Sequence, residues 1–168
     1  RVIGMGGALD SSRFKTYLSQ ALDRPANDIH GMVIGGHGDT TMIPLTRLAT
    51  YNGLPISDLI SEEELEEVSS STMVGGATLT KLLGTSAWYA PGASVAFLVK
   101  SILNDEKRII PCSVFLDGEY NQDDICIGVP CIIGKNGCEK IINLKLNDQE
   151  MVKFADSASA VRKMNLAL

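Results

Sequence analysis

Apolar residues recur every three or four positions in four segments of the chain, which is the spacing of one face of a helix. The first segment places Phe14, Leu18 and Leu22 on one face, and Pro25 follows it as a stop signal. The last segment carries Met151, Phe154, Ala158 and Val161 in the same way. The predicted helices cover residues 9–22, 62–83, 93–104 and 148–166.

The second of these segments has the clearest helix start. Ser61 and Glu64 form a capping-box pattern, and the acidic residues around Glu64 suit the positive end of a helix dipole. Gly75 and Gly76 in its middle predict a kink or the close approach of another backbone. Its predicted inner face consists of Leu65, Val68, Leu79 and Leu82.

Farther along, the hydrophobic period changes from helical to alternating. Segments 109–116, 125–133 and 138–146 are rich in β-branched residues, and Asn136-Gly137 is a hairpin signal that favours positive φ at both residues. Before them, Met32 to Ile34 reads as a short strand that enters a glycine-rich turn. Strands gathered together, with helices before and after, predict an α+β fold with an antiparallel sheet.

Composition narrows the classes of function. The chain has 168 residues, of which 45% are hydrophobic and 21% charged, as in ordinary globular domains. Its longest apolar run, from Val95 to Val99, is far too short to span a bilayer. A net charge of −5 disfavours nucleic acid as a partner. We therefore expect a single domain that binds neither nucleic acid nor membrane, in which local cations must attract any anionic substrate.

The chain contains four cysteines, at positions 112, 126, 131 and 138. None belongs to a C-x-x-C pair, and no histidine lies nearby in the sequence. Buried thiols in a reducing cytoplasm are the favoured interpretation, with a zinc site or a disulfide framework as alternatives.

The two histidines have different surroundings. His30 precedes a strand-like run and is expected to be a solvated residue at a strand end. His37 lies between glycines, which leaves room for a ligand beside the ring. Asp10 and Arg13 share one face of the first predicted helix. They are either a surface ion pair of little value or a functional pair, in which the carboxylate orients an imidazole and the guanidinium binds a substrate carboxylate.

Two further motifs fail on inspection. Val2 to Gly7 looks like a strand that enters a dinucleotide-binding loop, but Leu9 stands where the fingerprint requires its third glycine. The acidic stretch from Asp117 to Asp123 has calcium-like spacing without the bidentate glutamate that completes such a loop, so we expect a solvated hairpin loop. No metal ligands are assigned.

Six segments together resemble the lactate/malate dehydrogenase family, most closely the lactate-dehydrogenase-like malate dehydrogenases of bacteria. The two with the chemical groups are Leu9–Phe14 and Gly35–Pro44. The others are Ser71–Gly76, Gly84–Gly92, Ile110–Ser113 and Gly128–Pro130. The resemblance covers essentially the whole chain and implies the C-terminal substrate-binding and catalytic domain of that family.

The resemblance implies a role for each chemical group. His37 would be the general acid/base that takes the proton of the 2-hydroxyl, Asp10 would orient its imidazole, and Arg13 would bind the C1 carboxylate. Ser86 and Ala87 match a family segment beside the substrate and the nicotinamide. Gly36 stands where lactate dehydrogenases usually carry glutamate, which favours malate as the substrate.

The family's NAD-binding Rossmann domain, which also carries the arginine for a second carboxylate, has no counterpart in this sequence. We therefore expect a fragment of an NAD-dependent malate dehydrogenase, with no cofactor-binding residues of its own and negligible activity alone. The full enzyme is expected in the cytoplasm as a homodimer or homotetramer. Alternatives are another 2-hydroxyacid dehydrogenase, a non-catalytic oligomerisation or binding module, or a hydrolase using Ser11 or Ser12 with His37.

Overall fold

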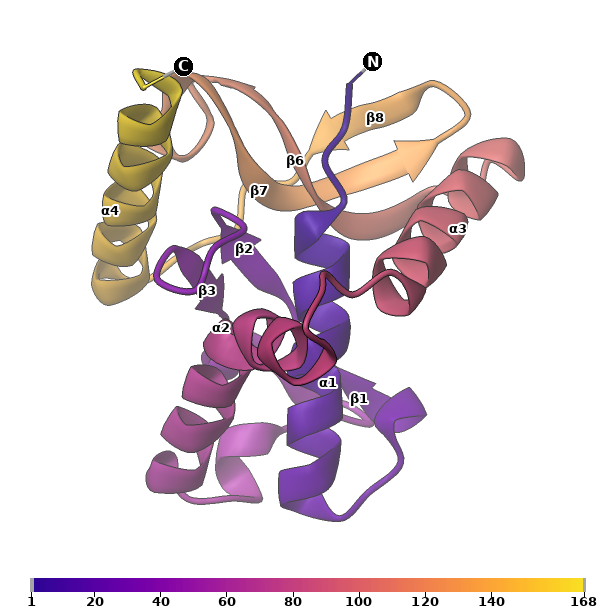
Figure 1. The fold of residues 1–168 in the computed structure, drawn as a ribbon, viewed down its shortest axis with the longest axis vertical. Coiled ribbons are helices and arrows are strands. Elements are labelled where there is room, and N and C mark those ends of the chain that lie inside the picture. Colours follow the sequence, from indigo (N-terminus) through magenta and orange to yellow (C-terminus); the bar gives the residue numbers. More distant parts are fainter. Residues whose placement is uncertain (1, 168) are drawn as a thin grey trace.

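The computed structural model describes residues 2–167, in which long helices pack around antiparallel sheets (Figure 1). Each predicted helix is present, and the second has the predicted bounds because Ser61 and Glu64 form the capping box at its start and Gly84 ends it with a φ of 68°. The α-helices are α1 (Gly6–Leu22), α2 (Glu62–Leu83), α3 (Tyr89–Leu103) and α4 (Asp148–Asn165).

The strands form one large sheet and one small sheet, and all their pairings are antiparallel. The large sheet has the order β3 (Met42–Pro44), β2 (Val33–Gly35), β7 (Asp123–Gly134) and β6 (Arg108–Asp117), with β8 (Gly137–Ile141) paired to β7. The small sheet consists of β1 (Ile29–His30), β4 (Thr50–Tyr51) and β5 (Leu54–Pro55). This arrangement confirms the predicted α+β class.

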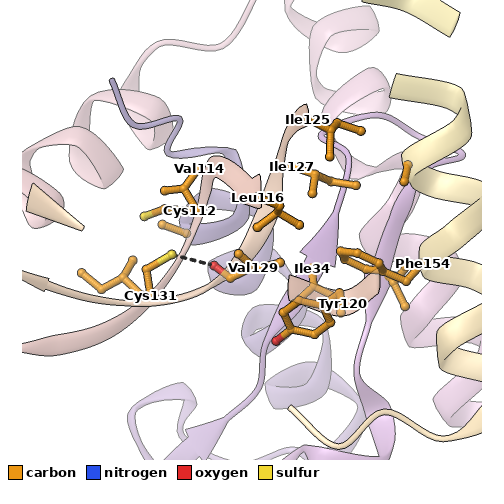
Figure 2. Close-up of a cluster of buried hydrophobic side chains, with 14 of the residues drawn as sticks. Ile34, Cys112, Val114, Leu116, Tyr120, Ile125, Ile127, Val129, Cys131 and Phe154 are labelled. Atoms are coloured by element: carbon orange, nitrogen blue, oxygen red, sulfur yellow. Dashed lines mark hydrogen bonds between the residues drawn. The ribbon is translucent and has the colours of Figure 1, made fainter. Parts of the chain in front are cut away.

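Two clusters of buried side chains hold these elements together. In the larger cluster, residues of β2, β6 and β7 pack against α4, where the rings of Tyr120 and Phe154 have centroids 5.0 Å apart (Figure 2). In the smaller cluster, Phe14 and Leu18 of α1 pack with Val68 of α2 and with β1 and β2. Strand β2 contributes to both clusters and therefore lies at the centre of the fold, where the turn that follows it begins.

The second half of α2 departs from the predicted inner face. Val68 is buried as expected, whereas Leu82 is 79% exposed and Leu79 is 36% exposed. The glycines allow a close approach, but by side chains of α1 and not by another backbone. A Cβ atom at Gly75 would lie 3.1 Å from the Tyr17 hydroxyl, and one at Gly76 would lie 3.1 Å from Arg13 Nη1.

The two largest errors in the predicted boundaries are the start of α3 and the end of β8. Helix α3 begins at Tyr89 and not at residue 93, because Pro91 falls in the first turn, where its missing N–H has no helical partner to lose. Strand β8 ends at Ile141, not at residue 146. There the Tyr120 hydroxyl donates to Ile142 O and accepts from Leu144 N, so this side chain takes the place of a partner strand.

The β7–β8 hairpin confirms the Asn136-Gly137 signal but not its expected geometry. Gly137 has a φ of 88°, whereas Asn136 does not have positive φ, and Gly134 pairs with Gly137. The loop that contains Tyr120 is also less solvated than predicted, because the Tyr120 side chain is buried. Both loops nevertheless connect neighbouring antiparallel strands, as predicted.

All four cysteines are free thiols, and the expectation of burial holds for Cys112 and Cys131. Cys138 is half-buried, and Cys126 is exposed, contrary to that expectation, because it occupies an outward position of β7. Burial raises the pKa of Cys112 to about 12, which keeps this thiol protonated at neutral pH. Cys112 of β6 and Cys131 of β7 therefore contribute to the packing of the core.

Candidate active site

His37 is located in the turn that connects β2 to β3. The two strands pair from Val33 opposite Pro44 to Gly35 opposite Met42. Gly35 has a φ of 89°, and its carbonyl oxygen lies against Gly128 of β7, where a Cβ atom would be only 2.6 Å away. The glycines therefore let the backbone of the turn pass close to β7 as it leaves the sheet. The His37 side chain in this turn is 53% exposed.

Asp10 links the other two predicted residues. It is 1% exposed, and its Oδ2 lies 2.7 Å from His37 Nδ1. Its Oδ1 accepts a hydrogen bond from Arg13 Nη1 at 3.1 Å. The buried carboxylate thus has one partner on each oxygen. The interpretation of Asp10 and Arg13 as a surface ion pair is wrong, because the Arg13 side chain is only 17% exposed and the Asp10 side chain only 2%.

Helix α1 is fixed against β2 in the orientation that this contact requires. Ser11 Oγ accepts a hydrogen bond from Val33 N at 2.9 Å and donates to Gly7 O at 2.7 Å. At the start of the helix, a Cβ atom on Gly6 would lie 2.7 Å from His37 Cγ. Glycine at this position therefore allows the helix to start directly beside the imidazole.

The electrostatic surroundings favour the protonated form of His37. Its pKa is raised above the ordinary value of 6.5, chiefly by the hydrogen bond with Asp10, while partial burial and the charge of Arg13 act in the opposite direction. Because Asp10 holds Nδ1, Nε2 is the nitrogen left to exchange a proton with a bound molecule. The pair can therefore work as a general acid and base near neutral pH.

An open cleft of about 560 Å³ lies in front of this group. Its walls come from α1, the His37 turn, the second half of α2 and the segment before α3. Small residues make up much of its lining, which leaves open space beside His37. The lining residues are Leu9, Arg13, His37, Gly38, Asp39, Met42, Gly76, Ala77, Thr80, Lys81, Ser86, Ala87 and Pro91.

The other candidates fall outside this group. His30 is exposed in β1, as predicted. The serine-hydrolase alternative finds no support, since the Ser11 and Ser12 hydroxyls donate to carbonyls of their own helix. Among residues 2–167, no three potential metal ligands gather into a site, and no helix is long and apolar enough to cross a membrane.

Sequence reasoning missed several residues that shape the cleft. Thr80 and Lys81 line it from α2, although the pattern assigned this part of the helix to the core. Gly76 permits the approach of Arg13, and the glycine pair inside a long helix was the signal for it. Gly6 carried no such signal, because its neighbour His37 is distant in the sequence.

The fold and this cleft define the class of protein. Residues 7–165 match the lactate/malate dehydrogenase, alpha/beta C-terminal domain family, and the chain belongs to that family. Among curated relatives, the malate dehydrogenase of Flavobacterium frigidimaris is 75% identical over 168 residues, which are 100% of this chain and 54% of the relative. The chain therefore spans about half the length of the curated relatives it matches.

Solved structures agree with this assignment. The malate dehydrogenase of Aeropyrum pernix superimposes with a TM-score of 0.97 at 43% identity, over 100% of this chain and 56% of the other. The lactate dehydrogenase of Cryptosporidium parvum, complexed with lactic acid and β-nicotinamide adenine dinucleotide, gives a TM-score of 0.94 at 37% identity, over 99% and 54%. Both members of the family thus share this domain architecture.

Proposed function

We propose that this chain is the catalytic and substrate-binding domain of an NAD-dependent malate dehydrogenase, which interconverts (S)-malate and oxaloacetate. The contact of buried Asp10 with both His37 and Arg13, which line an open cleft, carries the proposal. The names of the relatives support malate as the substrate. The whole chain acts as one domain in this proposal.

His37 acts as the acid/base in this reaction. In malate oxidation, neutral His37 accepts at Nε2 the proton of the C2 hydroxyl, and the C2–H bond breaks as a hydride departs. Bound NAD would supply the acceptor for that hydride, which the residues of this chain do not provide. Asp10 stabilises the imidazolium formed, because its carboxylate already accepts the proton on Nδ1. In the reverse direction, the imidazolium returns the proton to the carbonyl oxygen of oxaloacetate.

Arg13 binds the C1 carboxylate of the substrate. Its Nη1 is engaged by Asp10, so its other N–H groups form the planar fork that a carboxylate fits. The net charge of −5 makes this local cation essential for attracting a dianion. Lys81 in the same cleft adds positive charge, and an arginine from the rest of the enzyme completes recognition of the second carboxylate.

The remaining features of the enzyme follow from its family. NAD would bind mainly to the other half of the full-length protein, and Ser86 and Ala87 line the cleft that also holds His37. The exposed apolar side chains of α2 and α3 suit association, and we propose a homodimer or homotetramer located in the cytoplasm.

Substrate choice is tested with the full-length enzyme. Initial rates of NADH oxidation are compared for oxaloacetate and pyruvate at equal concentrations. The proposal predicts a strong preference for oxaloacetate. A preference for pyruvate would assign the protein to the lactate branch of the family and reject malate as the substrate.

The division of labour is tested with the 168-residue chain alone. We expect negligible malate oxidation and no measurable heat of NAD binding in a calorimetric titration, because the residues that would hold the hydride carrier belong to the rest of the enzyme. Robust turnover by this chain would refute the division.

A further inference from the structure

The turn that carries His37 is not closed by the sheet that bears it. The antiparallel pairing of β2 with β3 ends at Gly35 and Met42, and the next opposed residues are Gly36 and Thr41. A regular ladder would bring their backbone groups together directly. Here the side chain of Ser157, from α4, lies between the two strands' ends.

Ser157 makes one hydrogen bond to each side of the turn. Its Oγ accepts from Gly36 N at 2.8 Å and donates to Thr41 O at 2.6 Å. Ser157 is 3% exposed; its bond to Gly36 N is buried, and its bond to Thr41 O is partly buried. A Cβ atom at Gly35 would lie 2.9 Å from this hydroxyl, which means that glycine at position 35 makes the space that Ser157 occupies.

Side-chain contacts near both ends of helix α4 fix the position of Ser157. At its start, Arg47 binds Glu150 through two hydrogen bonds of 3.1 and 2.8 Å, and Glu150 also belongs to the capping box of the helix. Near its end, Arg162 donates to the Gln122 side chain and to Asp123 O. Phe154 is fully buried one turn before Ser157.

We propose that Ser157 is a positioning residue for the catalytic histidine, whose hydroxyl sets the separation of Gly36 and Thr41 and thereby places the His37 ring against Asp10. This inference rests on the proposed function for its kinetic consequence. Its geometric part, the position of His37 relative to Asp10, can be measured without turnover.

Loss of the hydroxyl leaves the buried Gly36 N–H and the partly buried Thr41 carbonyl without their partner. The two sides of the turn then close on each other or admit a water molecule, and either change moves His37. A shift of 1 Å in a catalytic group costs about 10²-fold in rate, so we expect a smaller shift to lower kcat by about 10-fold in Ser157→Ala. The KM for malate changes little, because Arg13 is carried by α1 and not by the turn.

The experiment uses the full-length enzyme with two matched serine controls. Ser159→Ala removes an exposed hydroxyl that bonds within the same helix, and Ser101→Ala removes a buried hydroxyl that joins α3 to Ile133 O of β7, away from His37. Thermal unfolding reports stability, and steady-state kinetics with malate reports kcat and KM. NMR titration of the His37 ring reports its pKa in the presence of its charged neighbours Asp10, Arg13 and Asp39.

The proposal predicts that only Ser157→Ala lowers kcat about 10-fold and moves the pKa of His37 down toward 6.5, since the bond to Asp10 is weakened. Unchanged kcat and an unchanged His37 pKa in a folded Ser157→Ala enzyme would overturn it. Turnover that is unaffected by His37→Asn would instead reject the proposed function and leave the NMR result to decide the positioning role.

A second pair of variants covers the case in which Ser157→Ala does not fold. Ser157→Thr keeps the hydroxyl, whereas Ser157→Cys has a longer and weaker hydrogen-bonding group. Threonine should retain kcat and the His37 pKa, and cysteine should lower both. Equal values in the two variants would contradict the proposal.

Discussion

The two walls of the cleft are built differently. On the α1 side, Asp10 is buried and bonded on both oxygens, and Ser11 fixes the helix to the strand before His37. On the opposite side, the second half of α2 and the segment before α3 expose large apolar side chains, with Leu82 at 79% and Trp88 at 61%. The packed wall carries the groups of the proposed proton transfer, whereas the open wall offers surface that other parts of the proposed enzyme can cover.

This difference separates the contacts that the domain forms by itself from the surface that a partner must cover. Hydrogen bonds within the described residues already orient His37 and Arg13, so their arrangement is formed without substrate. The open wall instead exposes several large apolar side chains, among them Leu82, Leu83 and Trp88. Substitutions on the packed wall, and at Gly76 where α2 contacts Arg13, should therefore change the kinetics, whereas substitutions of the exposed apolar residues on the open wall should change association.

The largest effect is expected from His37→Asn in the full-length enzyme. The substitution removes the proton acceptor, and kcat for malate oxidation should fall by about 10²- to 10⁴-fold, the usual contribution of acid/base catalysis. NAD affinity, measured by fluorescence or calorimetry, should be preserved. His30→Asn is the matched control, because His30 is exposed in β1 and should be silent. Retained turnover with lost NAD binding would contradict the assignment.

The next effect is expected from Arg13→Lys. Lysine keeps the charge but loses the planar fork, and it also loses the fixed bond to Asp10. A charge-assisted bond contributes about 1.5–3 kcal/mol, so kcat/KM for malate should fall by about 10- to 10²-fold. Arg24→Lys, at an exposed arginine near the end of α1, should leave the kinetics unchanged. An equally active Arg13→Lys enzyme would remove the carboxylate-binding role.

A smaller effect is expected from Gly76→Ala, which adds a methyl group 3.1 Å from Arg13 Nη1. The guanidinium must move by a few tenths of an ångström, and the KM for malate should rise severalfold at most, since a shift of 1 Å costs about 10²-fold. Gly92→Ala, in α3, has no atom within 4 Å of the added carbon and serves as the control. Indistinguishable KM values for Gly76→Ala and the unmodified enzyme would show that the added methyl group does not displace the Arg13 guanidinium.

The smallest effect is expected from Leu82→Ser on the open wall. Because this side chain is exposed, the free energy of unfolding of the 168-residue chain should change by less than about 0.5 kcal/mol. Val68→Ser, in the buried half of the same helix, should be clearly destabilising. Denaturant unfolding of both variants makes the comparison, and a large loss in Leu82→Ser would mean that the open wall is packed.

Local signals in the sequence were enough for much of this fold. The capping box at Ser61 and Glu64 defined α2, and alternation defined the long strands β6 and β7. Side chains from distant segments decided the rest. The hydrogen bonds of Tyr120 end β8 early, and the exposure of Leu82 does not follow from the periodicity of α2.

The candidate site shows the same division. Asp10, Arg13 and His37 were predicted from two motifs of a known family, and the structure brings them together. Ser157 was not predicted, because its partners Gly36 and Thr41 lie more than a hundred positions away and a serine inside a helix is an ordinary residue. Contacts of this kind depend on the packing of α4 and follow from no local pattern.

The most direct test of the account is the pH dependence of both reaction directions in the full-length enzyme. Asp10 raises the pKa of His37 above 6.5, and oxidation needs the neutral imidazole while reduction needs the imidazolium. Malate oxidation should therefore rise, and oxaloacetate reduction should fall, as pH increases through one shared midpoint above 6.5. Profiles that change in the same direction, or that persist unchanged in His37→Asn, would contradict the central claim that His37 is the acid/base.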